Sequence, residues 1–75
     1  MNIMEKAEKI ASEIKIKMAI KKAIKLKIPG LLNSSDPADL LKGILLTIEI
    51  TTDLDLTREE GLKVLNVCRK LARKY

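Results

Sequence analysis

The sequence predicts an all-α protein of three helices, and three observations support this. Long segments are rich in Ala, Leu, Lys and Glu, which are strong helix formers. Apolar residues in these segments recur three and four positions apart, which places them on one side of a helix. Turn and capping signals bound each segment: Pro29-Gly30 ends the first, Pro37 opens the second and Thr57 opens the third. The predicted helices span 3–28, 37–51 and 58–74.

The first predicted helix, over residues 3–28, carries apolar residues on two nearly opposite sides. One side has the stripe Ile3, Ala7, Ile10, Ala11, Ile14 and Met18. The other side has Ile16, Ala19, Ile20, Ala23 and Ile24. Such a helix either bends, here near 15–17, or contacts different partners with its two halves. A straight helix of this length measures roughly 39 Å, whereas a compact domain of this size is roughly 29 Å across. We therefore expect it to extend beyond a compact monomer.

The two later helices have clear start signals. Pro37 suits the first helical position, where its missing N–H does no harm, and Asp36 before it can cap the free N–H groups. Thr57 and Glu60 form a capping-box pattern. The second helix is expected to end near the two β-branched residues at 51–52. The apolar sides are Ala38, Leu40, Leu41, Ile44, Leu45 and Ile48 in the second helix, and Val64, Leu65, Cys68, Leu71, Ala72 and Tyr75 in the third.

A second pattern supports a different fold. Apolar residues occupy nearly all even positions over 14–28, and a looser alternation runs over 44–56. Alternation with a period of two is typical of a half-buried strand. Helix is favoured because the first stretch has no turn residues for a hairpin, and the second follows a strong helix start. The alternative is a small α+β fold with strands near 13–20 and 46–52.

The chain is expected to complete its helical bundle by oligomerisation. A domain this small buries only about 60% of its unfolded surface, and without disulfides or metal the usual remedy is association. We predict a homodimer or higher assembly, built mainly through the first helix. The alternative is a monomer of four short helices. The predicted self-association and core residues are Ile3, Ala7, Ile10, Ile14, Met18, Ile20, Ile24, Leu41, Ile44, Leu45, Ile48, Leu65, Cys68 and Leu71.

Charge is distributed in blocks. Residues 1–30 carry eight Lys and three Glu, residues 31–60 carry seven acids and two bases, and residues 61–75 carry five bases and no acid. One interpretation is that the acidic middle lies beside a basic end, within or between chains. The other is a surface for phosphates or for an acidic partner. Its candidate residues are Lys15, Lys21, Lys22, Lys25, Arg69, Lys70, Arg73 and Lys74.

The composition argues against catalysis. The chain has no His and one Cys, which excludes Ser-His and Cys-His pairs, most zinc sites and an internal disulfide. Asp53, Asp55 and Thr57 form a DxDxT string that resembles the motif of haloacid dehalogenase phosphatases. Those enzymes need a large α/β domain with further residues well downstream, so here the string is interpreted as an acidic connector. We predict no catalytic, cofactor-binding or metal-binding residue.

These observations predict a non-catalytic, oligomeric helical protein that acts by protein–protein interaction. A small regulator, inhibitor, immunity-type or accessory factor fits this description. One alternative is a sequence-nonspecific nucleic-acid binder that uses the Lys-rich first helix and the basic C-terminus. Another is a peripheral membrane-surface binder. The single thiol and the lack of a signal peptide favour a reducing, cytoplasmic setting.

Overall fold

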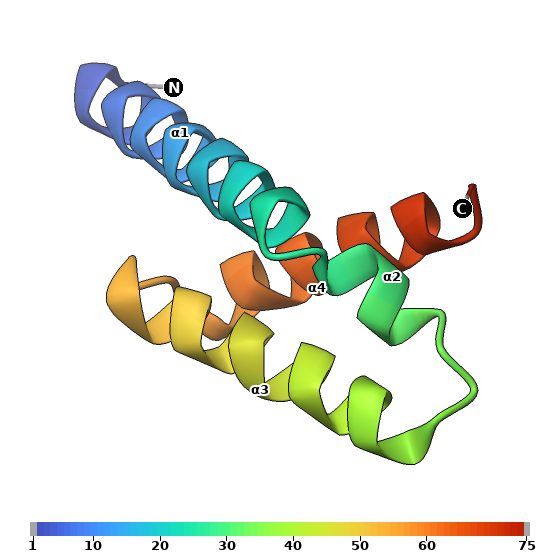
Figure 1. The fold of residues 1–75 in the computed structure, drawn as a ribbon. Helices are drawn as coiled ribbons and strands as arrows, with labels where there is room; N and C mark the ends of the chain where they lie inside the picture. The colour runs from blue at the N-terminus through green and yellow to red at the C-terminus, as the bar shows by residue number, and fades with distance from the viewer. Residues whose placement is uncertain (1, 75) are drawn as a thin grey trace.

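The computed structural model describes residues 2–74 and consists of four α-helices (Figure 1). They are α1 (Ile3–Lys25), α2 (Ile28–Leu32), α3 (Pro37–Asp53) and α4 (Arg58–Ala72). The prediction of an all-α fold is confirmed. The alternative with strands near 13–20 and 46–52 is wrong, because both segments are helical and none of residues 2–74 lies in a strand. Tyr75, expected on the apolar side of the last helix, lies outside the described residues.

The first predicted helix, over 3–28, is divided in two. α1 ends at Lys25, the chain turns at Lys27, and α2 starts at Ile28. Pro29 is tolerated in the first turn of a new helix but not within a continuing one, so the chain turns just before it. Lys27 takes the left-handed conformation (φ 61°), which glycine adopts more readily, while Gly30 lies within α2. The bend considered near 15–17 does not occur, since α1 is one helix across these residues.

Side-chain caps hold three of the helix starts. The Asp36 carboxylate accepts a hydrogen bond from the backbone N–H of Ala38 at 2.9 Å. Thr57 and Glu60 form both hydrogen bonds of the capping box, which confirms the start of α4. The Asn2 side chain caps α1 through the N–H of Glu5 at 2.8 Å. Since each cap satisfies N–H groups that have no partner inside the helix, these starts are encoded locally.

α3 continues past its expected end at residues 51–52. The Thr51 hydroxyl donates to the carbonyl of Thr47 at 2.6 Å, and the Thr52 hydroxyl donates to that of Ile48 at 3.0 Å. Both hydroxyls thus bond carbonyls within the helix instead of ending it, and α3 extends to Asp53. The last helix is shorter than predicted. It was expected to span 58–74, but α4 ends at Ala72.

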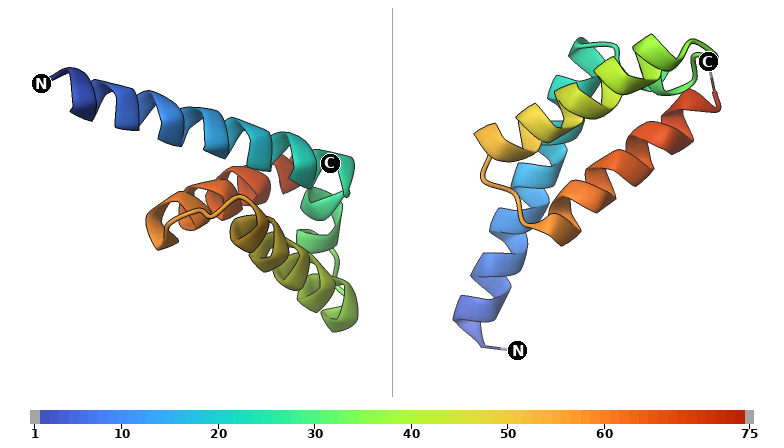
Figure 2. Two further views of the ribbon diagram at one scale, coloured as in Figure 1. Left: turned by 90° about the vertical axis from the view of Figure 1, so that its left-hand side faces the viewer. Right: turned by 90° about the horizontal axis from the view of Figure 1, so that it is seen from below.

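The helices meet around a small aliphatic core. Its members are Ala19, Ala23, Ile28, Ile50, Val64 and Cys68. α2 contacts each of the other helices, and α1 packs mainly on α4. In Figure 2 (left), α2, α3 and α4 lie together beneath the middle and C-terminal part of α1. The two buried residues of α1 are both alanines, which allow the neighbouring helices to approach closely.

The molecule is elongated because the start of α1 extends beyond the other helices (Figure 2). Its extents are 47 × 23 × 18 Å and its radius of gyration is 13.4 Å, against about 11 Å for a compact chain of this length. Every residue from 2 to 11 is exposed. Ser12 is the first that is partly buried, and its hydroxyl donates to the Glu60 carboxylate. The expected overhang of the first helix is thus present.

Candidate functional site

One apolar surface runs along the side of α1 that faces away from α3 and α4. We call it the outer stripe, and it consists of Ile3, Ala7, Ile10, Ala11, Ile14 and Met18. Ile3 is 87% exposed, and Ile10, Ile14 and Met18 are each more than half exposed. On the opposite side, Ala19 and Ala23 are buried. α1 is one continuous helix, so one of its two apolar sides packs on the chain's own helices and the other stays exposed.

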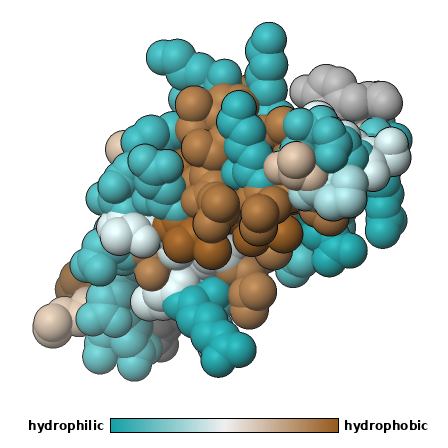
Figure 3. Space-filling model, turned by 60° about the horizontal axis from the view of Figure 1, so that its bottom comes forward, coloured by the Kyte–Doolittle hydropathy of each residue, from teal (hydrophilic) through white to brown (hydrophobic). Residues whose placement is uncertain are grey.

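A second apolar surface lies on α3. This α3 patch consists of Leu40, Leu41, Ile44, Leu45 and Ile48, and two of its members, Leu40 and Ile44, also line a shallow hollow with Leu65 and Arg69 of α4. Figure 3, which views the molecule with its α3 side brought forward, shows hydrophobic residues gathered in one continuous area. Leu41, Leu45 and Ile48 are each more than half exposed. Two large apolar surfaces on different helices are therefore open to solvent at once.

The α3 patch corrects one expectation about the core. Leu41, Ile44, Leu45 and Ile48 were expected to fill the core of the chain, but the buried side of α3 is formed by Gly43, Thr47 and Ile50. Gly43 lets α2 approach closely, since a Cβ there would lie 3.1 Å from side-chain atoms of both Leu31 and Leu32. The buried Thr47 hydroxyl is satisfied because it donates to the Gly43 carbonyl at 2.8 Å. Close approach thus decided which side of α3 packs.

Other predicted core residues are distributed as follows. Cys68 is fully buried, Ile20, Leu65 and Leu71 are half-buried, and Ile24 is 44% exposed. Sequence reasoning missed Ile28 and Ile50, which are among the most buried side chains. The sequence predicted Ile28 as the last residue of the first helix, whereas in the structure it begins the separate helix α2. Ile50 was signalled only by the helical spacing of residues 43, 47 and 50.

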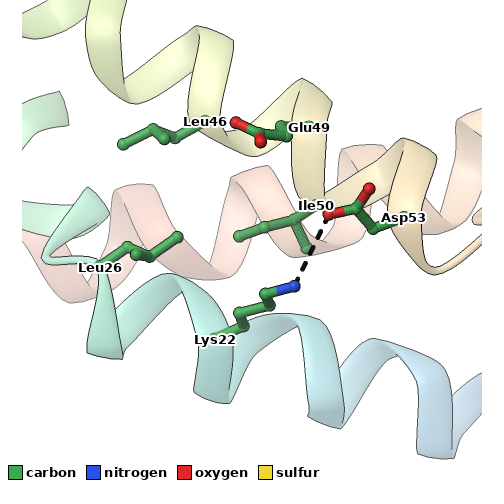
Figure 4. Close-up of a pocket in the computed structure, with 6 residues that line it drawn as sticks. All are labelled: Lys22, Leu26, Leu46, Glu49, Ile50 and Asp53. Carbon is green, nitrogen blue, oxygen red and sulfur yellow. Dashed lines mark ion pairs between the residues drawn. The ribbon is translucent and has the colours of Figure 1, made fainter.

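The acidic middle of the chain lies beside the lysines of α1. Lys22 and Asp53 form an ion pair at 3.7 Å, the one ion pair found among residues 2–74 (Figure 4). It borders a shallow cleft between α1 and α3 that is also lined by Leu26, Leu46, Glu49 and Ile50. Lys15 lies near enough to Glu60 to contribute to its electrostatics. Two of the predicted anion-binding lysines are therefore next to carboxylates of their own chain.

Glu60 links the start of α4 to α1. Hydrogen bonds from Ser12 and from the Thr57 backbone hold the pKa of its carboxyl below the usual value, with a smaller contribution from Lys15. All of these stabilise the charged form. The carboxylate therefore acts as a structural group that caps α4 and ties it to α1.

A basic surface covers the exposed side of α4. Asn66, Arg69, Lys70 and Arg73 line a shallow hollow on this helix. Of the predicted anion-contact residues, the structure brings together Arg69, Lys70 and Arg73 here, whereas Lys15 and Lys22 lie beside acids. At helical spacing, Lys21 and Lys25 continue the outer side of α1 beyond Met18. None of the three basic side chains that line the hollow is in an ion pair within the described part of the chain.

The remaining chemistry is limited. Burial raises the pKa of the Cys68 thiol, which disfavours the reactive thiolate. Residues 2–74 contain no group of three His, Cys, Asp or Glu side chains able to hold a metal ion. A search of the same residues finds no helix of the length and hydrophobicity that crossing a membrane requires. What the described surfaces offer is apolar contact and positive charge.

No protein family, curated protein or solved structure was found to match this chain.

Proposed function

We propose that this chain is a non-catalytic, self-associating helical protein that acts by binding another protein, as a regulator, inhibitor, immunity-type or accessory factor. The observation that supports this best is the simultaneous exposure of the outer stripe on α1 and the α3 patch. The two surfaces belong to different helices, so one copy of the chain covers neither. One of them is available for association between copies while the other stays open for a partner.

The energetics favour covering these surfaces. Fully burying an Ile, Leu or Met side chain contributes about 1.5–3 kcal/mol, and large exposed apolar patches mark interaction sites in soluble proteins. The core that the chain makes on its own is small, with Ile28, Ile50, Val64 and Cys68 as its largest fully buried side chains. Association adds apolar burial that the single chain lacks.

The mass in solution tests self-association. At micromolar concentration, sedimentation or light scattering should report at least two chains of 8.4 kDa. The double substitution Ile10→Gln and Ile14→Gln should shift the mass toward one chain, because it replaces two apolar side chains of the outer stripe.

The matched control is Glu5→Gln with Lys9→Gln, which introduces the same residue on the same helix but outside the stripe. It should leave the mass unchanged. A native chain that sediments as a single copy would contradict self-association, and equal effects of the two pairs would exclude the outer stripe as its surface.

The basic surface of α4 supports a second candidate function, the binding of nucleic-acid phosphates. Arg69, Lys70 and Arg73 share one exposed side of a single helix and lack intrachain partners among residues 2–74. Asn66 beside them can also donate to a phosphate oxygen. α4, rather than the Lys-rich part of α1, is therefore the better candidate for this role.

Charge reversal on α4 tests this candidate. Native protein should bind duplex DNA at low salt, with an affinity that falls linearly in a plot of log affinity against log salt. Arg69→Glu with Arg73→Glu should strongly weaken binding and lower the salt slope of the remaining binding by about 0.9 per lost phosphate contact. Lys21→Glu with Lys25→Glu, which makes the same change in net charge on α1, should retain the greater part of the binding. No shift of duplex or single-stranded probes by the native chain would eliminate the candidate.

A further inference from the structure

We infer that the outer stripe of α1 pairs with the outer stripe of a second copy in an antiparallel arrangement, with the two-fold axis between Ile10 and Ala11. This inference rests on the proposed self-association and specifies its geometry. A two-fold contact uses the same surface on both copies, so the stripe must complement itself.

The sizes of the stripe residues favour the antiparallel direction. Around an axis between Ile10 and Ala11, Ala7 of each copy faces Ile14 of the other, and Ile3 lies opposite Met18. At the central levels small residues then meet large ones, which favours close packing there, and the larger pair of Ile3 and Met18 lies at each end. An in-register parallel pair would place Ile14 against Ile14 and Ala7 against Ala7, leaving the helices wide apart at one level and a gap at the next.

The charges favour the same direction. Past Met18, the outer side of α1 continues with Lys21 and Lys25. In a parallel pair each of these lysines would face its own copy, which is destabilising. In the antiparallel pair the two sets of lysines lie at opposite ends and do not face each other.

Opposite charges also meet along one edge of the antiparallel pair. Glu8, which is exposed, lies on the same edge as Lys15 of the partner subunit, and this contact occurs twice by symmetry. Lys15 is partly buried and also lies near Glu60 of its own chain. On the other edge, Lys6 lies between Glu13 of the partner subunit and Lys17 of the partner subunit, so attraction and repulsion offset each other there.

The shape of the molecule leaves room for this contact. α3 and α4 pack on the inner side of α1, and the outer stripe residues Ile10, Ile14 and Met18 are more than half exposed. In an antiparallel pair, α2, α3 and α4 of one copy lie at one end of the paired α1 helices and those of the other copy lie at the opposite end. Both sets lie on the sides of α1 that face away from the contact. The projecting start of each α1 then lies along the C-terminal half of the partner's α1. The overhang thus acquires a partner along its apolar side.

Thiol crosslinking tests the direction of the pair. A short bismaleimide is applied to single variants Ile10→Cys, Ile3→Cys and Met18→Cys, with the native chain as control because its one thiol, Cys68, is fully buried. Ile10→Cys should give crosslinked dimers. Ile3→Cys and Met18→Cys should each give almost none alone, since residues 3 and 18 are roughly 22 Å apart along the helix. Refolded together, these two variants should give crosslinked heterodimers, which mass spectrometry separates from either homodimer.

The other outcomes are distinguishable. Efficient crosslinking of Ile3→Cys to itself would show a parallel pair and overturn the inference while leaving self-association intact. A dimeric mass with no crosslink at any of the three positions would show that another face is used, which also overturns it. A single-chain mass for the native protein would instead overturn the proposed function on which the inference rests.

Discussion

Ile28→Ala is expected to lower the free energy of unfolding by about 2–5 kcal/mol, the range for a buried aliphatic residue cut to alanine. Ile28 is 0% exposed and belongs to the short helix α2, which contacts all three other helices. The cavity would therefore loosen several contacts at once. A domain of this length has a total stability of only about 4–11 kcal/mol, so the variant should be largely unfolded at moderate urea. Urea titration followed by circular dichroism measures the loss.

Ile24→Ala is the matched control for this prediction. It makes the same chemical change four residues earlier in the chain, at a side chain that is 44% exposed. Its loss should be less than half of that for Ile28→Ala, because less apolar surface returns to water and no closed cavity forms. Equal losses for the two variants would contradict the assignment of Ile28 as the centre of the core.

Ala23→Leu is expected to destabilise the protein by about 1–3 kcal/mol through overpacking. Ala23 and Ala19 are both fully buried where α1 meets the other helices. A leucine at this position has no space to occupy without moving the neighbouring helices. The thermal midpoint should therefore fall even though leucine is a good helix former.

Ala38→Leu serves as the control for overpacking. Ala38 is exposed near the start of α3, and its cap to Asp36 uses only the backbone N–H. The thermal midpoint should stay close to that of the native chain, as for most surface substitutions. A similar fall in both variants would mean that the loss comes from leucine itself rather than from crowding between helices.

Much of the candidate site could be read from the sequence because α1 has an unusual pattern. Its apolar residues form two stripes on opposite sides, and a straight helix can bury only one of them in so small a chain. The structure shows Ile10 and Ile14 exposed and Ala19 and Ala23 buried. Whether the exposed stripe mediates association stays a prediction.

The basic surface was less predictable. Lys15 and Lys22 belong to the most concentrated lysine block of the sequence, yet both lie beside carboxylates that come from distant positions in the chain. Arg69, Lys70 and Arg73 of α4 have no ion-pair partner among residues 2–74. No local pattern reveals which bases have intrachain partners, since pairing depends on how α1 lies against the α3–α4 connection.

The helices and their starts follow from local chemistry. Asp36, Thr57 and the helix-forming residues act within one turn of the chain. The positions where α3 and α4 start can therefore be predicted from neighbouring residues in the sequence. The turn at Lys27 also has a local cause, since Pro29 cannot lie within a continuing helix. The buried side of α3 depended instead on contacts between remote segments. α3 has apolar residues on both sides, and the side that packs is the one where Gly43 lets α2 come close. Steric fit between helices is a property of the assembled fold, and no single segment contains it.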